Sequence, residues 1–286
     1  MKLNRFLSVV LLVVFSFQGF AQIKLTDPIP VDPNVKIGRL PNGLTYYIRK
    51  NTRPEKKVEL RLAVNTGSVL EDNDQRGLAH FMEHMGFNGT KNFKKNELVD
   101  YLQKVGVKFG ADLNAYTGFD ETVYILPIPS DDPKILEQGF TVLEDWAFNN
   151  LLDKSEIEKE RGVVLEESRL SKGSQQRMLR QYFPKLFNGS KYAERLPIGA
   201  DSVLQHFKPE VLQRFYKQWY RPNLMSVIVV GDIDPVVAEQ KIRAHFGSYK
   251  NPATAKVRPA IIPIRQRTKP EAMVAQCVRT RRGRFV

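Results

Sequence analysis

The chain has 286 residues, of which 42% are hydrophobic and 26% are charged, values that are ordinary for a globular protein. Its single cysteine, Cys277, excludes an internal disulfide framework. The formal net charge is +13, but nine basic residues against one acid between positions 256 and 286 supply +8 of it. Because a nucleic-acid-binding protein carries its basic excess on a folded face with aromatic groups, no nucleic-acid binding is expected.

The first 21 residues have the organisation of a secretory signal peptide. Lys2 and Arg5 precede the apolar run Phe6–Phe17, and Gly19-Phe20-Ala21 ends in a small residue before Gln22. An uncleaved anchor is the alternative, although the run is short for a transmembrane helix and no later segment is apolar enough to span a bilayer. We therefore expect that the mature chain begins at Gln22 and that it is exported to a periplasm.

The following segment predicts strands. Val35–Leu40 and Leu44–Arg49 flank Pro41-Asn42-Gly43, which is a strong hairpin signal. A half-buried strand is indicated by apolar residues at every second position, namely Val58, Leu60, Leu62 and Val64. In the polar loop that comes next, Asp72 and Asp74 are expected to cap a helix.

Residues 77–86, Gly-Leu-Ala-His-Phe-Met-Glu-His-Met-Gly, carry the motif around which the sequence is organised. In a helix, His80 and His84 lie on one face about 6 Å apart, within reach of one shared Zn²⁺. Glu83 can point toward the same ion without binding it. The order His-x-x-Glu-His is the inverted form of the metalloprotease helix motif. The alternative is a helix with incidental histidines, but two of the chain's four histidines fall within these five residues.

The remaining elements alternate between helices and strands. Apolar residues at helical spacing predict a helix from Leu98 that ends at Gly106. Residues 109–130 are expected to be extended, with a turn near Gly118 and a strand end or edge at Pro127. Asp131-Asp132-Pro133 opens a helix with a packing face formed by Leu136, Phe140, Leu143 and Trp146.

In the second half, Ser155 and Glu158 predict a capping box for a helix that runs to about Leu186. Another helix is expected over Pro209–Tyr220, where Phe215, Trp219 and Tyr220 are interpreted as packing residues rather than a stacking platform. Asn223–Val230 predicts a buried strand, and Val236–Phe246 a last helix. The pattern indicates an α+β fold in which helices pack on a mainly antiparallel sheet.

The carboxylates of the Ser155 helix are candidates for a third metal ligand. Glu160 and Glu167 lie on one stripe with Ile157, Val163 and Val164, because seven residues return to nearly the same angle. Glu166 points about 100° away. A carboxylate on an apolar stripe needs a partner, and zinc would be such a partner for Glu167, with Glu160 as an orienting group. From the spacing alone, two solvated acids remain an equal alternative.

Three stretches resemble the pitrilysin/insulinase family of zinc peptidases: Gly77 to Met85, then Asn88-Gly-Thr, and Glu160-Arg-Gly-Val-Val-Leu-Glu-Glu. The resemblance implies that Glu167 is the third ligand of one Zn²⁺ per chain and that Glu160 is the supporting acid. Ala111 to Thr117 resembles an edge strand of the family that holds peptides by strand addition, so Asn114 and Ala115 are candidate substrate contacts. His206 and His245 fit no part of this site and are expected to be surface or packing residues.

The resemblance also implies metal-assisted peptide hydrolysis. Zinc lowers the pKa of its water toward about 7, and Glu83 acts as the general base on that water. The expected substrates are peptides or unfolded polypeptide segments.

The predicted organisation is a signal peptide over 1–21, an extension over 22–34, a catalytic domain over 35–250, and a basic tail or truncated linker over 251–286. Members of the family build a closed chamber from two or four such domains, so a second homologous domain or partner chain is expected. The alternative to an active peptidase is an incomplete half-enzyme that binds zinc and extended peptides but needs a second half for turnover.

Overall fold

The computed structural model describes residues 30–95, 97–104, 114–187 and 189–259. The chain divides into two units, Met1–Pro33 and Asn34–Val286, and the second contains the helices and strands described below. The predicted signal peptide, Cys277 and the basic end beyond Pro259 lie outside the described residues. Within the described part, no helix has both the length and the apolar character needed to cross a membrane.

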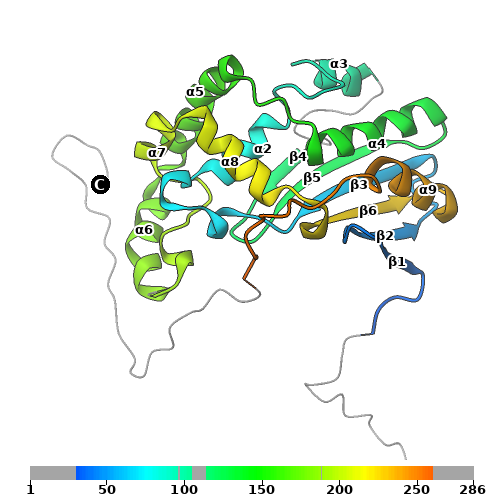
Figure 1. Ribbon diagram of the computed structural model, residues 1–286, viewed down its shortest axis with the longest axis horizontal. Helices are drawn as coiled ribbons and strands as arrows, with labels where there is room; N and C mark the ends of the chain where they lie inside the picture. Colours follow the sequence, from blue (N-terminus) through cyan, green and yellow to red (C-terminus); the bar gives the residue numbers. More distant parts are fainter. Residues whose placement is uncertain (1–29, 96, 105–113, 188, 260–286) are drawn as a thin grey trace, which may run out of the picture. The chain divides into compact units, whose positions relative to one another are not determined.

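Among the described residues, six strands form one mixed sheet in the order β1-β2-β6-β3-β5-β4 (Figure 1). Their bounds are β1 Val35–Arg39, β2 Thr45–Lys50, β3 Lys57–Val64, β4 Asn114–Thr117, β5 Thr122–Pro129 and β6 Met225–Gly231. Every neighbouring pair is antiparallel except β2 and β6, which run parallel. The mainly antiparallel sheet of an α+β fold and the first hairpin are therefore confirmed.

The α-helices are α2 Leu78–Met85, α3 Glu97–Lys104, α4 Pro133–Phe148, α5 Lys154–Ser171, α6 Ser174–Leu186, α7 Asp201–His206, α8 Pro209–Trp219 and α9 Pro235–Phe246. Short 3-10 helices are η1 Ser68–Leu70, η2 Asn73–Gln75, η3 Lys191–Ala193 and η4 Pro222–Leu224. Helix α4 packs on β3 and β5, and α9 packs on β2. Gly139 allows α4 to approach the sheet closely, since a Cβ there would lie 2.3 Å from the Ile128 Cδ1 atom.

The sheet buries one face against these helices. The predicted apolar residues of β3 are at most 1% exposed, while Lys57, Glu59 and Arg61 alternate with them on the other face. Strand β6 was expected to be buried throughout, but only alternate residues are, and Val230 is 36% exposed. The reason is that the helices bury one face of the sheet, while every second residue of β6 lies on the other face, beside the exposed residues of β3.

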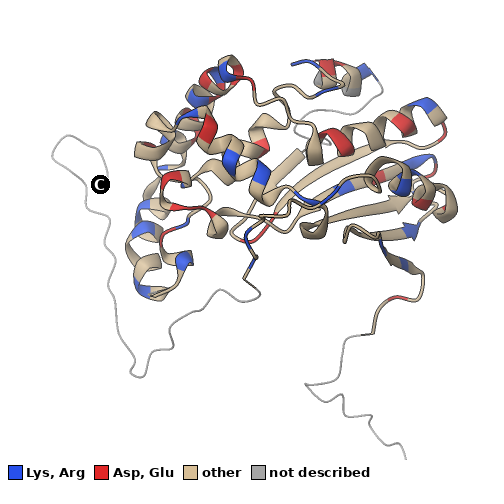
Figure 2. Cartoon of the chain, viewed as in Figure 1, with Lys and Arg blue, Asp and Glu red and all other residues tan. Residues whose placement is uncertain are grey.

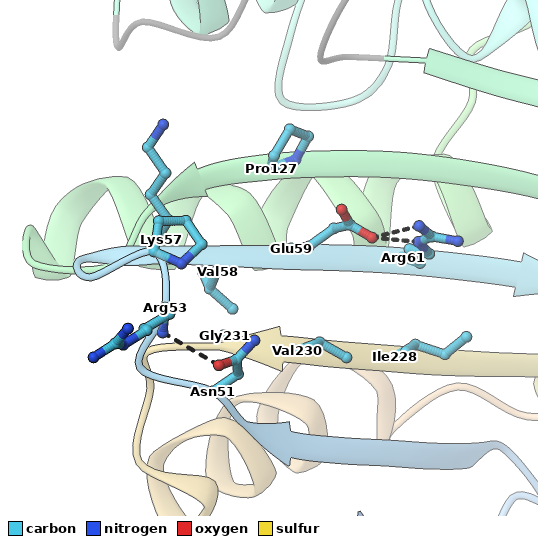
Figure 3. Close-up of a pocket in the computed structure, with 11 residues that line it drawn as sticks. Asn51, Arg53, Lys57, Val58, Glu59, Arg61, Pro127, Ile228, Val230 and Gly231 are labelled. Carbon is cyan, nitrogen blue, oxygen red and sulfur yellow. Dashed lines mark hydrogen bonds and ion pairs between the residues drawn. The ribbon is translucent and has the colours of Figure 1, made fainter.

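That second face carries a hollow of about 440 Å³ (Figure 3). Arg53 and Lys57 lie at one end, and Glu59 pairs with Arg61 along β3. None of the residues that line it belongs to the histidine helix. This hollow is therefore separate from the candidate site described below.

Two predictions about the second half were wrong. The helix expected from Ser155 to Leu186 is two helices, because the chain breaks at Lys172-Gly173 between α5 and α6. The cap of α5 is Asp153, whose carboxylate accepts hydrogen bonds from the backbone N–H groups of Ser155 at 2.8 Å and Glu156 at 3.3 Å. Helix α8 agrees with the prediction, and its aromatic residues Phe215 and Trp219, with Tyr220, are buried.

Candidate metal centre

The histidine motif forms helix α2, most of whose surface is apolar and buried. Its buried apolar residues are Leu78, Ala79, Phe81, Met82 and Met85. His80 and His84 have ring centroids 4.7 Å apart and ring planes at 86°. Their Nε2 atoms are 3.3 Å apart. The helix therefore brings two imidazole nitrogens to the separation expected for ligands of one metal ion.

The start of α2 differs from the prediction, because neither Asp72 nor Asp74 caps it. Asp72 caps the short helix η2, and Asp74 pairs with an arginine of α8. The residue before α2 is Gly77, whose φ of +104° favours glycine and which has no side chain to act as a cap. Instead, the carboxylate of Glu71 accepts hydrogen bonds from the N–H groups of Gly77 at 3.0 Å and Ala79 at 2.8 Å.

Helix α5 brings the two candidate carboxylates to α2. Its buried residues are Ile157, Glu160, Val164 and Ser168. Val163, which was expected on the same stripe, is 53% exposed, and the side chain of Glu167 is 49% exposed. The buried stripe is thus rotated away from Val163 and toward Ser168. This rotation leaves Glu167 at the outer edge of the stripe, open to solvent.

The side chains of His80, His84 and Glu167 converge across the two helices. The Oε2 atom of Glu167 lies 3.3 Å from Nε2 of His84 and 3.6 Å from Nε2 of His80. Four tetrahedral ligands at about 2.0–2.1 Å from zinc would be about 3.3–3.4 Å from one another. The three atoms fit one Zn²⁺, and among the described residues no other group of three His, Cys, Asp or Glu side chains converges in this way.

Glu160 contacts the other side of the His84 ring. Its Oε1 atom is 2.7 Å from Nδ1 of His84, and its Oε2 atom accepts a hydrogen bond from Asn88 Nδ2 at 2.8 Å. Burial tends to raise the pKa of Glu160, but the hydrogen bonds from His84 and Asn88 outweigh it and hold the pKa below its usual value. Glu160 is therefore a carboxylate that orients His84 so that Nε2 faces the other two candidate ligands.

The two histidines have opposite pKa shifts. Burial, together with the neighbouring His84, lowers the pKa of His80 to about 4. Burial also acts to lower the pKa of His84, but the hydrogen bond to Glu160 and the surrounding carboxylates raise it above its usual value. Because a metal ion binds the neutral imidazole, protons compete with the metal mainly at His84.

Glu83 lies on α2 beside His84 and is only 8% exposed. The hydroxyl group of Thr117 donates a hydrogen bond to its Oε2 atom at 2.6 Å. Burial raises the pKa of Glu83, and the hydrogen bond from Thr117 partly opposes this shift. A carboxyl group with a raised pKa next to such a cluster is suited to accepting and returning a proton.

Strand β4 contains both predicted substrate contacts. Within the described residues it pairs only with β5 and so forms an edge of the sheet. Asn114 is exposed, and its Oδ1 atom accepts a hydrogen bond from the N–H of Ala115, a half-buried residue that packs on the core. The last residue of β4 is Thr117, which connects this edge to Glu83. The substrate roles of Asn114 and Ala115 remain predictions.

Three polar residues of this region were missing from the predicted site, namely Glu71, Asn88 and Thr117. Asn88 and Thr117 lie within stretches that carry the family resemblance, so the motifs themselves could have indicated them. Glu71 lies in a polar loop, and no spacing rule distinguishes it from its acidic neighbours.

The other two histidines lie elsewhere. His206 is exposed, and its Nδ1 atom is 2.9 Å from the carbonyl oxygen of Ser202. His245 joins α9 to α4, with Nδ1 2.7 Å from Glu144 and Nε2 3.2 Å from Glu137. Both therefore have the surface or packing roles that the sequence indicated.

Two family models match the sequence. The model described as "Insulinase (Peptidase family M16)" matches residues 46–195, which include α2 and α5. A second model, "Peptidase M16 inactive domain", matches residues 206–281.

Individual relatives agree with these matches. "Probable zinc protease PqqL" of Haemophilus influenzae is 39% identical over 245 residues, which are 85% of this chain and 26% of that protein. "Zinc protease PQQL-like" of Arabidopsis thaliana is 38% identical over 242 residues, or 80% of this chain and 25% of that protein. The crystal structure of the first half of the periplasmic protease PqqL from Escherichia coli has a TM-score of 0.78 at 35% identity, covering 84% of this chain and 51% of that one. The chain thus spans about a quarter of the length of the curated relatives it matches.

Proposed function

The chain belongs to the insulinase family, peptidase family M16, and from this premise we propose that it carries the catalytic domain of a zinc metalloendopeptidase. The proposed substrates are peptides or unfolded segments of polypeptides. The names of the two curated relatives support both the metal and the reaction. His80, His84 and Glu167 would hold one Zn²⁺ per chain.

The observation that carries this proposal is the spacing of the three candidate ligand atoms. The separations of 3.3, 3.3 and 3.6 Å among two Nε2 atoms and one Oε2 atom fit three protein ligands that would hold one Zn²⁺. The alternative that the sequence left open was a pair of solvated acids on a charged helix. Such acids would point into solvent and would not lie against two imidazole rings.

The chemistry at this site divides between the metal and the side chains. When bound, zinc supplies Lewis-acid chemistry, which polarises the scissile carbonyl group and makes a water molecule more acidic. Glu83 accepts a proton from the attacking water and returns it to the nitrogen of the leaving amine. Thr117 holds the Oε2 atom of Glu83, which leaves Oε1 for the proton. Glu160 keeps the ring of His84 in place during the reaction.

We propose that the peptide substrate adds to the outer edge of β4 as a further strand. Main-chain hydrogen bonds along Asn114 and Ala115 would hold it without regard to most of its side chains. Support for this comes from the hydrogen bond between Thr117 and Glu83, because a peptide that follows β4 passes the general base at the end of the strand.

The curated relatives are longer than this chain, and their additional length bears on how turnover occurs. Because the chain corresponds to about a quarter of each curated relative, we propose that turnover needs a second homologous domain or chain that closes a chamber around the peptide. The isolated chain would then bind zinc and extended peptides but hydrolyse them slowly.

We also propose that the protein is exported to a periplasm after cleavage before Gln22. The charged and apolar pattern of residues 1–21 supports this, as does the similarity to a protease described as periplasmic. N-terminal sequencing of the protein recovered from the periplasmic fraction is expected to return Gln22, and a sequence beginning at Met1 would contradict the proposal.

Turnover of internally quenched peptides tests the function. We expect zinc-loaded protein, supplied with the remaining domains as found in its longer relatives, to cleave unstructured peptides, and a chelator to stop cleavage. The isolated chain is the comparison, and the Glu83→Gln variant of the complete protein is the blank. Cleavage that the chelator does not stop, or a wild-type protein that binds no zinc, would overturn the proposal.

A further inference from the structure

The two histidines of the candidate metal centre are held in different ways. The ring of His84 is fixed by the hydrogen bond between its Nδ1 atom and Glu160. The Nδ1 atom of His80 is buried and has no hydrogen-bond partner among the described residues. Second-sphere hydrogen bonds usually orient histidine ligands, so the orientation of His80 needs another source. The remaining source is the position of the helix backbone that carries it.

The backbone just before His80 is held by Glu71. This carboxylate is completely buried, and it reaches the helix start from six residues before Gly77. Its Oε1 atom is 3.0 Å from the Gly77 nitrogen and 2.8 Å from the Ala79 nitrogen, and its Oε2 atom is 3.0 Å from the Gly77 nitrogen. Both oxygens thus face the positive end of α2, where free N–H groups and the helix dipole favour a carboxylate.

A side chain at the N-cap position itself could not make these bonds. Gly77 has a φ of +104°, and a Cβ there would lie 3.0 Å from the Gly199 Cα atom. Gly199 is restricted by the same contact, since a Cβ on Gly199 would lie 2.4 Å from the Gly77 Cα atom. This contact leaves no room for the Ser, Thr, Asp or Asn that usually caps a helix. The capping group therefore has to come from elsewhere in the chain.

The loop that carries Glu71 is itself fixed by Arg195. This arginine is 4% exposed, and its Nε atom donates to the carbonyl oxygen of Glu71 at 3.1 Å. Its Nη2 atom donates to Asn73 Oδ1 at 2.6 Å, and its own carbonyl accepts from the Ser68 hydroxyl at 2.6 Å. Burial raises the pKa of Glu71, while the hydrogen bonds from the N–H groups of Ala79 and Gly77 and the charge of Arg195 act in the opposite direction and favour the carboxylate.

We propose that Glu71 is the positioning residue for His80: it fixes the N–H group of Ala79 and thereby the ring that the adjacent residue offers to the metal. The inference rests on the proposed zinc site. The Glu71 carboxylate accepts from the backbone N–H groups of Gly77 and Ala79, so its effect passes through the start of α2. In this arrangement a different glutamate positions each histidine. Glu160 contacts the ring of His84, and Glu71 holds the backbone next to His80.

The test compares zinc binding by the wild-type chain and by Glu71→Gln. Glutamine keeps the size of the side chain but places an NH₂ group against the Gly77 N–H. We expect the variant to fold and its zinc affinity, measured by competition with a chromophoric chelator, to fall on the order of 10–100-fold, as for other orienting groups of metal ligands. The Co²⁺-loaded variant should show an altered visible spectrum, and the Ala79 amide should exchange its hydrogen faster.

Two controls separate positioning from general destabilisation. Asp74→Asn changes a nearby exposed acid of the same loop, one that pairs with Arg214, and should leave zinc affinity unchanged. Val58→Ala removes buried volume from β3 and should lower the melting temperature without altering the Co²⁺ spectrum. If Glu71→Gln does not fold, Glu71→Asp serves instead, because its shorter carboxylate should lose the Ala79 contact.

Wild-type zinc affinity and an unchanged Co²⁺ spectrum in the folded Glu71 variant would overturn the inference. A wild-type chain that binds no zinc, or binds it equally well after His80→Ala, would instead contradict the metal site itself. The failure of the positioning role and the failure of the proposed function are therefore distinguishable.

Discussion

The Oε1 atom of Glu160 lies 2.7 Å from the Nδ1 atom of His84, although the two residues are 76 positions apart in the chain. This contact links helix α5 to helix α2. Since Glu167 is two helical turns after Glu160, the same docking brings its carboxylate to the Nε2 atoms of both histidines. The candidate metal centre thus depends on how two helices meet, and the predictions below test its parts.

The first prediction concerns the metal ligands. His80→Ala and Glu167→Gln should each lower zinc affinity by more than the 10–100-fold typical of an orienting residue, because each removes a ligand. Glu166→Gln is the matched control, since Glu166 pairs with Arg169 at 2.6 Å on another side of α5. Elemental analysis should find about one zinc in the wild-type chain. Loss of zinc in the Glu166 variant but not in the Glu167 variant would reverse the assignment.

The second prediction separates zinc binding from chemistry. Glu83→Gln keeps the size of the side chain and can still accept the hydrogen bond from Thr117, but it removes the base. Zinc should remain bound, while peptide hydrolysis by the complete protein should fall by about 10²–10⁴-fold. Zinc content and turnover are measured on the same preparation. Retained activity would assign the base to another residue, and lost zinc would make Glu83 structural.

The third prediction concerns the hydroxyl group of Thr117. Its hydrogen bond lowers the pKa of Glu83, so Thr117→Val should raise that pKa further. Because the base must be unprotonated, the acid limb of the pH profile of kcat/KM should move to higher pH. Activity on the alkaline side should change less. Thr141→Val is the control and should leave the profile in place, because the Thr141 hydroxyl donates only to the Glu137 carbonyl oxygen within α4.

The fourth prediction concerns Asn88. This amide bridges the Glu160 carboxylate and the carbonyl oxygen of His84, so Asn88→Ala should loosen the group that orients His84. Zinc affinity should fall on the order of 10-fold or more without loss of the fold. Asn51→Ala, at the hollow on the open face of the sheet, should have no such effect. Equal zinc affinities for the two variants would remove Asn88 from the site.

The fifth prediction concerns the pH dependence of zinc binding. The pKa of His80 is lowered to about 4, so near neutral pH its ring is already neutral and releases no proton to the metal. The raised pKa of His84 makes this ring the one that must lose a proton, and zinc affinity should fall as pH decreases through that pKa. Below the pKa of His84, a plot of log Kd against pH should fall with a slope of about one proton per zinc. A slope near two would show that both rings titrate.

Several parts of the fold could be predicted because their signals are local. Two histidines four residues apart share a face in any helix, and alternating apolar residues in β3 face one side in any strand. The Asp132-Pro133 start of α4 is likewise a local signal, and the structure agrees with it. A local signal can also mislead. The predicted capping box at Ser155 was wrong, because Asp153, two residues earlier, caps α5.

The sequence by itself determined the histidine pair and the mainly antiparallel α+β pattern, and the family resemblance singled out Glu167 and Glu160 among the acids. Only the tertiary structure decided that Glu160 supports His84, that Glu167 approaches both rings, and that Glu71 rather than Asp72 or Asp74 caps the histidine helix. The physical reason is that each of these carboxylates acts on a segment that the chain brings close only when it folds. Helical periodicity sets the direction of a side chain from its own axis, but the packing of one element on another sets what that side chain meets.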